Sequence, residues 1–380
     1  MLLWAAGVLA VPGQVDKLYV RVLGYGRYWG ETGEVARPTI DDVASLAGVS
    51  IKTVSRVVNR EPNVRESTRV KVEKAIAELK YRPNPSAQNL ASRRAHLIVL
   101  VYDDPSAYEI PSSAYIIEMQ QGALRACRNA GFELLIHPCN YRNRYVGREL
   151  QELIGQVRPA GIILAAPLSN MPKIVRSVRE TGAPYVRLSH GGENGSEYSV
   201  ATDDRAFSAA MTLYLASLGH RRIAFIKGNT LHTAVNNRYE GYKQGLEEAG
   251  LPFSDKLVAQ GDNSIGSGEA AAAELLHREP RPTAIFCAND DMAAGVLRVA
   301  MRLGIRIPED LSIAGCDDIS LARQLNPSLT TIRQPLDAMA EAAALALIEG
   351  ARGAAHEPGL EVVPGELKIR ESTAPPLVTA

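Results

Sequence analysis

The feature that most constrains the fold of this chain is a regular alternation of short apolar runs and helical segments, which begins at His96. The runs LIVLVY, FELLIH, AGIILAAP and PYVRLS come first, and the rhythm repeats after Tyr198 with RRIAFIKG, TAIFCAND and LSIAGCDD. Strands that alternate with helices are typical of parallel sheets. We therefore predict an α/β core with two lobes, each built on a doubly wound parallel sheet.

Polar residues stand where several of these strands would end. Three of the ends read Tyr102-Asp103-Asp104, Ala288-Asn289-Asp290 and Cys316-Asp317-Asp318. In doubly wound sheets, ligands bind outside the carboxyl ends of the strands. The sequence therefore predicts a cleft on which polar side chains converge. Helix capping by Asp290 and a role in its own loop for Asp318 are the simpler alternatives for these two residues.

Three helices are predicted in positions 37–81. The first lies in TIDDVASLAG, where Thr39 can cap the helix, Asp42 can complete a capping box, and Gly48 ends the helix. Ser50 caps a second helix after a short turn, and STRVKVEKAIAELKY forms the third. Two helices joined by a tight glycine-containing turn, with a third that closes a small core, are typical of a helix-turn-helix module.

The second helix has one wholly polar face. At 100° per residue, Lys52, Ser55, Arg56 and Asn59 share that face, opposite Val54, Val57 and Val58. Positions 37–94 hold twelve Lys/Arg and six Asp/Glu, a net charge of +6, although the whole chain has a net charge of zero. A basic module on a mildly acidic body indicates a local anion-binding surface. An ordinary solvated basic face is the alternative.

Two further segments have no clear core pattern. RPNPSAQNLASRR can form a short helix with Pro85 in its first turn, but about eight residues are marginal alone, so we expect disorder until something packs against it. Residues 1–36 show neither a periodic face nor a basic region ahead of their apolar run. We expect a disordered extension or a misassigned start rather than a signal peptide.

Several classes of protein are disfavoured. No apolar run reaches the ~18 residues of a membrane span. The four cysteines are widely spaced and lack a CxxC motif, which is typical of free thiols rather than of a disulfide or metal site. There is no GxGxxG after a strand and no GxxxxGK[ST], GxSxG or HExxH, so we expect no enzyme, cofactor or metal.

An ordered series of stretches carries a resemblance to a known family. TIDDVASLAGVSIKTVSRVVN and TRVKVEKAIAELKYRPNPSAQNLAS resemble the DNA-binding head and hinge of the lac repressor (LacI/GalR) family. The body agrees, because LGHRRIAFI, RYEGYKQGLEEAG, IFCANDDMAAGVLRVAMRLGIRIPEDLSIAGCDD, PSLTTIRQP and IRESTAPP recur in that family in this order. The resemblance extends over residues 37–376.

The resemblance implies a cytoplasmic, homodimeric transcriptional repressor that binds a palindromic operator in double-stranded DNA. A small-molecule effector, a sugar or glycoside, would bind between two lobes shaped like the periplasmic sugar-binding proteins, with crossovers near Ser199, near Arg333 and near the final strand. The implied domains are a helix-turn-helix head (37–83), a hinge helix (84–95), a first lobe (96–198 plus 334–352) and a second lobe (199–333 plus 353–380). A soluble sugar-binding protein without DNA function is the alternative, against which the basic head argues.

Several head residues suit DNA contacts, and the resemblance supports them. Arg56 is best placed to bond guanine O6 and N7, Lys52 can donate to the same acceptors, and Ile51 can rest against a thymine methyl. Short donors suited to phosphates are Thr39, Ser50, Thr53, Ser55 and Asn59. The family position that matches Leu90 inserts into the minor groove at the operator centre; packing within the dimer is the alternative.

The same resemblance implies a set of effector-binding residues. Arg238 matches an arginine that holds effector hydroxyls or a carboxylate, and Asn289 and Asp317 match positions that bind sugar hydroxyls. Asp103 and Tyr115 would lie at the mouth of the first lobe, and Gln334 on a crossover. Asn263 departs from the family, which commonly has an aromatic residue there. This indicates a more polar or larger effector, for which Arg187, expected to face the same cleft, can compensate.

Overall fold

The computed structural model describes residues 38–58, 64–81, 95–103, 114–189, 197–355 and 357–377. The chain divides into two compact units, Met1–Pro83 and Asn84–Ala380, which we call the head and the core. The predictions for residues 1–36, Asn59, Leu90 and Asp104 lie outside the described residues. Of the predicted hinge (84–95), only the backbone of Ala95 is described.

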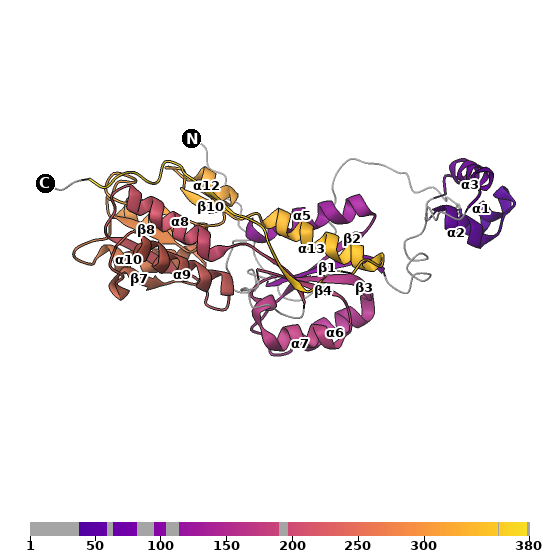
Figure 1. The fold of residues 1–380 in the computed structure, drawn as a ribbon, viewed down its shortest axis with the longest axis horizontal. Helices are drawn as coiled ribbons and strands as arrows, with labels where there is room; N and C mark the ends of the chain where they lie inside the picture. The colour runs from indigo at the N-terminus through magenta and orange to yellow at the C-terminus, as the bar shows by residue number, and fades with distance from the viewer. Residues whose placement is uncertain are drawn as a thin grey trace, which may run out of the picture. The chain divides into compact units, whose positions relative to one another are not determined.

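The head contains α1 (Ile40–Ala47), α2 (Ile51–Val58) and α3 (Glu66–Leu79) (Figure 1). Its small core consists of Val43, Ala44, Val54, Val57, Val72 and Ala75. The capping box is confirmed, because the Asp42 N–H donates to the Thr39 hydroxyl at 3.3 Å and the Thr39 N–H donates to the Asp42 carboxylate at 2.7 Å. Gly48 ends α1 in the left-handed region at φ 64°, where a side chain would be strained.

The first lobe is built on a six-stranded parallel sheet with the strand order β11-β5-β4-β3-β1-β2. Its strands are β1 (Ala95–Asp103), β2 (Glu133–Cys139), β3 (Pro159–Leu164), β4 (Tyr185–Leu188), β5 (Tyr198–Ala201) and β11 (Gly359–Val362). Figure 1 shows α5 (Ala114–Ala130) and α13 (Leu336–Ala351) on one face, and α6 (Val146–Val157) and α7 (Pro172–Glu180) on the other. Both faces are therefore covered, which explains why the central strands β1 and β3 read as nearly continuous apolar runs.

The second lobe has a four-stranded parallel sheet with the order β7-β6-β8-β9. Its strands are β6 (Ile223–Lys227), β7 (Val258–Gln260), β8 (Ala284–Cys287) and β9 (Ser312–Ala314). The helices are α8 (Asp204–Ser217), α9 (Thr233–Glu248), α10 (Ile265–Leu276), α11 (Asp290–Arg302) and the short α12 (Ser320–Gln324). Within the lobe, α8 packs against α9 and α10 packs against α11.

Short crossovers join the two lobes, beside a ribbon of two antiparallel strands, β10 (Thr331–Arg333) and β12 (Glu366–Lys368). The predicted lobe boundaries need correction. Because β5 pairs with β4 and β11 pairs with β5, residues 199–201 and 359–362 lie in the first sheet, although the sequence assigned both to the second lobe. The runs YSVA and GLEV are short, and nothing in them identifies the sheet that they join. Among the described residues, no helix combines the length and apolarity that crossing a membrane requires.

Candidate functional site

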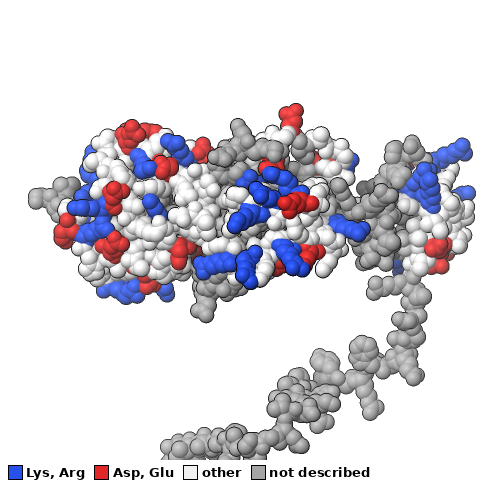
Figure 2. Space-filling model, turned by 90° about the horizontal axis from the view of Figure 1, so that it is seen from below, with Lys and Arg blue, Asp and Glu red and all other residues white. Residues whose placement is uncertain are grey.

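The head presents the polar face of α2. Val54 and Val57 are buried at 0% and 4% exposure, whereas Lys52 and Ile51 are exposed and Arg56 is partly exposed. In the view of Figure 2, the basic side chains of the head gather on one side, apart from its acidic ones. The arrangement matches a recognition helix that packs on its apolar side and offers its cationic side to DNA.

The short polar residues of the head have partners within it. The Ser50 hydroxyl accepts from the Thr53 N–H at 3.2 Å and lies 2.9 Å from the Thr53 hydroxyl. The Thr39 hydroxyl donates to the Asp42 carboxylate at 2.8 Å. These bonds fix the beginnings of α1 and α2, where backbone N–H groups lack partners within the helix. The phosphate contacts of these residues stay a prediction.

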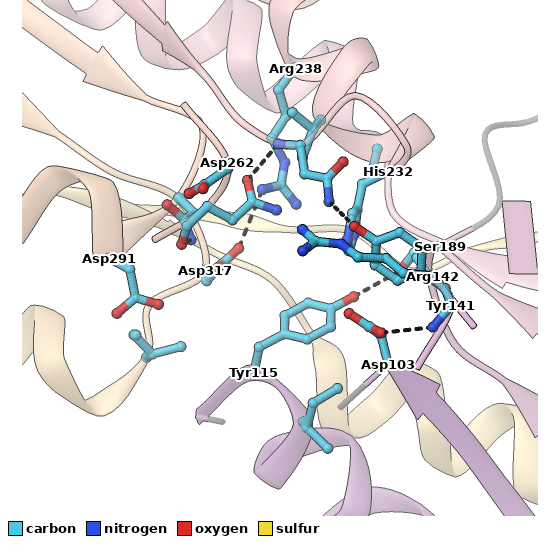
Figure 3. A pocket seen from close by; sticks show the side chains of 18 residues that line it. Asp103, Tyr115, Tyr141, Arg142, Ser189, His232, Arg238, Asp262, Asp291 and Asp317 are labelled. Carbon is cyan, nitrogen blue, oxygen red and sulfur yellow. Dashed lines mark hydrogen bonds and ion pairs between the residues drawn. The ribbon is translucent and has the colours of Figure 1, made fainter. Parts of the chain in front are cut away.

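A cleft of about 1070 Å³, counting the space open to solvent, lies between the two lobes of the core (Figure 3). The first lobe contributes Asp103, Tyr115, Ile116, Tyr141, Arg142, Ala166 and Ser189; the second contributes Asn229, His232, Ala234, Val235, Arg238, Asp262, Asn263, Asn289, Asp291, Asp317 and Ile319. Most of these residues follow the carboxyl end of a parallel strand or begin the next helix. The cleft is therefore where ligands of doubly wound sheets bind.

Arg238 organises the second-lobe wall of the cleft. This residue lies on α9 and is only 4% exposed. Its Nε donates to Asp204 at 2.8 Å, and its NH1 donates to the Ala288 carbonyl at 2.5 Å and to Asp317 at 3.4 Å. A buried guanidinium needs such partners, because an unpaired buried charge is strongly destabilising.

The carboxylate of Asp317 accepts hydrogen bonds from both Arg238 and Gln334. The side-chain amide of Gln334 donates to the same carboxylate oxygen, Oδ1, that Arg238 reaches. Burial raises the pKa of Asp317 to about 7, although the charge of Arg238 and the Gln334 hydrogen bond both oppose the rise. The backbone of Asp317 has φ 125°, a conformation that side chains rarely adopt. Strain of this kind is often found at binding sites.

Two other cleft groups are uncharged at neutral pH. Burial raises the pKa of Tyr115 to about 12, and its hydroxyl lies 3.3 Å from the Ser189 hydroxyl. Burial and the positive charge of Arg238 lower the pKa of His232 to about 4. Phenol and neutral imidazole both donate and accept hydrogen bonds, so they suit hydroxyl groups of a ligand.

One hydrogen bond crosses the cleft from lobe to lobe. The Asn229 amide, after β6, donates to the Tyr141 hydroxyl at 3.3 Å, and Tyr141 follows β2 in the other lobe. The backbone N–H of Tyr141 also lies 3.5 Å from Asp103 Oδ1, at the limit of a hydrogen bond. The loop after β2 is therefore connected to both walls.

Five of the seven predicted effector residues line the cleft: Asp103, Tyr115, Arg238, Asn289 and Asp317. Gln334 does not line it but holds Asp317. Arg187, which was also expected to face the cleft, is not among its lining residues; its Nε donates to the Ser169 carbonyl at 2.8 Å and its guanidinium lies 3.8 Å from Glu197. The side-chain oxygen of Asn289 caps α11 at Met292, and its amide donates to the Asn263 carbonyl.

The two alternatives raised for Asp290 and Asp318 have different outcomes. Asp290 does not cap its helix, since Asn289 does; it accepts instead from the Thr331 hydroxyl at 2.5 Å and from the Ile319 N–H at 3.0 Å. Asp318 does not line the cleft; its carboxylate accepts from Arg333 and Arg370, which lie outside its own loop, so it links that loop to two distant segments.

Several residues that line the cleft were not predicted from the sequence. They are Tyr141, Arg142, Ser189, Asn229, His232, Asp262 and Asp291. Most follow β2, β4, β6 or β7, whereas the polar strand ends that predicted the cleft were those of β1, β8 and β9. Ligands bind outside the carboxyl ends of all the strands in such a sheet, so the residues after every predicted strand would have included most of them.

Comparisons with known proteins find matches for both the head and the core. Residues 39–84 match the family of bacterial regulatory proteins of the lacI family, and residues 212–373 match the periplasmic binding protein-like domain. The HTH-type transcriptional regulator DegA of Bacillus subtilis is 33% identical over 341 residues, which cover 89% of this chain and 99% of DegA.

Solved structures of transcriptional regulators are also similar to this chain. The complex of the transcriptional regulator CelR with cellobiose has a TM-score of 0.68 at 32% identity and covers 88% of this chain and 100% of its own. The lac repressor dimer bound to operator and the anti-inducer ONPF has a TM-score of 0.73 at 26% identity and covers 89% of this chain and 100% of its own. With its helix-turn-helix head and two-lobed core, the chain belongs to the LacI family of bacterial transcriptional regulators.

Proposed function

We propose that this protein is a cytoplasmic, homodimeric repressor that binds a palindromic operator and changes its operator affinity when an uncharged, polyhydroxylated effector occupies the cleft. The observation that carries the proposal is the cleft itself. Strand ends from both lobes supply its polar groups, so one ligand can contact both lobes at once. A ligand held in this way favours one relative orientation of the lobes.

The DNA half of the proposal rests on α2. Arg56 and Lys52 bond base edges in the major groove, and Ile51 contacts a thymine methyl. The proposed phosphate contacts are Thr39, Ser50, Thr53, Ser55 and Asn59, which set the register on the duplex. Leu90 enters the minor groove between the two half-sites. The similarity to the lac repressor, whose dimer is solved bound to operator, supports binding of the head to operator DNA.

The charges of the cleft favour a neutral effector. Apart from Arg238 and its partner Asp317, the cleft is lined by three carboxylates, those of Asp103, Asp262 and Asp291, against the guanidinium of Arg142. Arg238 already pairs with Asp204 and Asp317, so its charge is balanced within the protein. A phosphate or sulfate group would meet excess negative charge, whereas sugar hydroxyls can donate to the carboxylates and accept from Arg142. Binding of cellobiose by CelR agrees with an uncharged saccharide.

A thermal-shift screen tests the effector class. Neutral mono- and disaccharides, their phosphorylated forms and nucleobases are each added to the purified protein. We expect stabilisation by at least one neutral saccharide and none by its phosphorylated counterpart, because only a ligand of the native state raises the melting temperature. A response confined to phosphorylated sugars or nucleobases would overturn the proposed class.

A mobility shift on a palindromic promoter fragment tests the regulator. The fragment is titrated with protein alone and with the stabilising saccharide. The expected result is specific binding whose affinity changes by fivefold or more on addition of saccharide, as a coupling of 1–3 kcal/mol gives roughly 5–150-fold. Identical binding to scrambled DNA would contradict a sequence-specific repressor.

A further inference from the structure

Three side chains with metal-binding atoms converge in the first lobe, outside the effector cleft. His137 and Cys139 lie two residues apart on β2, so they share one face of the strand, and Glu149 lies on α6. One ligand atom of each, an imidazole nitrogen, the thiol sulfur and a carboxylate oxygen, lies within 4.8 Å of the others. In Figure 1, β2 and α6 belong to the lobe whose other strands and helices form the first wall of the cleft.

The imidazole of His137 has an unsatisfied atom that faces this group. Its Nε2 is buried and has no hydrogen-bond partner among the described residues. Glu149 Oε1 lies 3.6 Å from this nitrogen, beyond hydrogen-bond distance. A buried polar nitrogen without a partner is costly, so a ligand that bonds His137 Nε2 at this point would be stabilising.

We propose that His137, Cys139 and Glu149 bind a divalent transition metal ion of the Zn²⁺ class. Imidazole nitrogen, thiolate sulfur and carboxylate oxygen are the ligands that Zn²⁺ takes, at about 2.0–2.3 Å from the ion. Such bonds place the ligand atoms about 3.5 Å apart, so the three close in by roughly 1 Å on binding. The Mg²⁺ and Ca²⁺ ions are disfavoured because they require oxygen ligands.

The surroundings permit this movement and give the ion a way in. The side chain of Glu149 is 46% exposed and that of His137 is 22% exposed, and β2 is the edge strand of its sheet. Cys139 is only 2% exposed, so its sulfur is held more tightly than the two more exposed ligands. On binding, the thiol gives its proton to solvent, because the ligand is the thiolate. Three protein ligands leave a fourth position for water.

The site would also fix a loop of the effector cleft. The chain leaves β2 at Cys139 and begins α6 at Val146, and the intervening loop carries the cleft residues Tyr141 and Arg142. An ion bound by Cys139 and Glu149 ties together the two ends of that loop. This consequence rests on the proposed function, whereas the metal site itself does not. A metal site was not predicted from the sequence, because Glu149 comes from a different element and completes the set only in three dimensions.

A cobalt titration tests the site on the reduced, full-length protein without a histidine tag. Co²⁺ bound to a thiolate gives a charge-transfer absorption in the near ultraviolet. We expect this band to saturate at one ion per chain, to disappear in Cys139→Ser and to remain in Cys127→Ser, which alters a buried thiol on α5. No band in the native protein, or an equal band in Cys139→Ser, would overturn the proposal.

A second experiment does not depend on a change to a buried residue. Zn²⁺ is added to the native protein, to His137→Gln and to Glu149→Gln, and the melting temperature is measured. The native protein should melt at least 3 °C higher with Zn²⁺, and both variants should lose most of that shift, because an ion that binds only the native state stabilises it. A shift of equal size in all three proteins would place the metal elsewhere and reject the site.

Discussion

The side-chain amide of Gln334 donates to Oδ1 of Asp317, and this hydrogen bond joins a lobe crossover to the effector cleft. Gln334 lies between β10 and α13, where the chain returns from the second lobe to the first. Asp317 lines the cleft, and Arg238 reaches the same oxygen. A ligand that bonds Asp317 thus acts on a carboxylate already connected to the segment that must move when the lobes reorient.

We expect Asp317→Asn to weaken effector binding without affecting DNA binding in the absence of effector. Asparagine keeps the size of the side chain and an oxygen that accepts from Gln334, but it removes the charge that Asp317 carries above its pKa of about 7, so binding is compared at about pH 8.5. A hydrogen bond to a charged group contributes about 1.5–3 kcal/mol, so the effector Kd should rise roughly tenfold to a hundredfold. Calorimetry with the saccharide found by thermal shift measures this change.

The matched control is Glu240→Gln, which removes a carboxylate from the exposed side of α9. Its effector Kd should equal that of the native protein. Operator affinity without effector should stay within about twofold for both variants, because the head does not contain either residue. Loss of operator binding by a folded, dimeric Asp317→Asn protein would show that Asp317 does more than bind the effector.

The buried carboxyls predict a pH dependence of stability. Burial raises the pKa of Asp317 to about 7 and that of Asp204 to about 6, from an ordinary value of 3.8. The unfolded chain therefore loses these protons at lower pH than the folded protein does. Their contribution to stability is full below about pH 4 and is lost as pH rises through 6 and 7.

Replacement of both carboxyls by amides removes this titration. Urea unfolding of the native protein and of the Asp204→Asn/Asp317→Asn variant at several pH values gives the difference between their unfolding free energies. We expect this difference to move in favour of the variant between pH 4.5 and pH 7.5. A difference that stays constant over that range would mean that neither carboxyl has a raised pKa in the folded protein.

Much of the head could be predicted from sequence because its signals are local. The Thr39–Asp42 capping box, the left-handed Gly48 and the valine face of α2 all depend on residues within one or two turns. The same is true of the apolar strands of the core. The residues that specify each of these elements are close together in the sequence, so the sequence alone indicates the element.

The failures depend on contacts between distant segments. Arg187 was expected in the cleft because it stands near a strand end, but Ser189 lies there instead. Ser189 has φ 53°, so the alternation of side chains along β4 does not continue to it. The assignment of β5 and β11 to the first sheet likewise depends on pairing across 160 residues, as the Ser199–Gly359 hydrogen bond shows. No local pattern contains that information.

The contact between α5 and α13 gives a prediction about stability. A Cβ built on Gly122 would lie 1.9 Å from the backbone oxygen of Asp337, so this glycine lets the two helices approach closely. We expect Gly122→Ala to lower the free energy of unfolding by about 1–3 kcal/mol, because neither backbone can yield without loss of packing. Urea unfolding at neutral pH measures the effect.

Gly155 on α6 is the matched control for that substitution. A Cβ at this position has no atom within 4 Å among the described residues. Gly155→Ala should raise stability by about 0.5–1 kcal/mol, because alanine loses less conformational freedom than glycine in a helix. Equal effects of the two substitutions would show that the spacing between α5 and α13 does not limit the packing of the first lobe.

The recognition helix gives the last prediction, in which specificity and affinity should separate. Arg56→Ala and Lys71→Ala each remove one positive charge, from α2 and from an exposed position on α3. Both variants should lose a similar, small part of the salt-dependent binding to scrambled DNA, since that term is spread over many phosphates. Only Arg56→Ala should lose discrimination between operator and scrambled DNA, by about 1–3 kcal/mol or roughly 5–150-fold, because a bidentate contact to guanine reads one base. Competition mobility shifts at two salt concentrations measure both quantities. If Arg56→Ala kept the native preference for operator, another side chain of α2 would read the base, and Lys52 would be the next residue to replace.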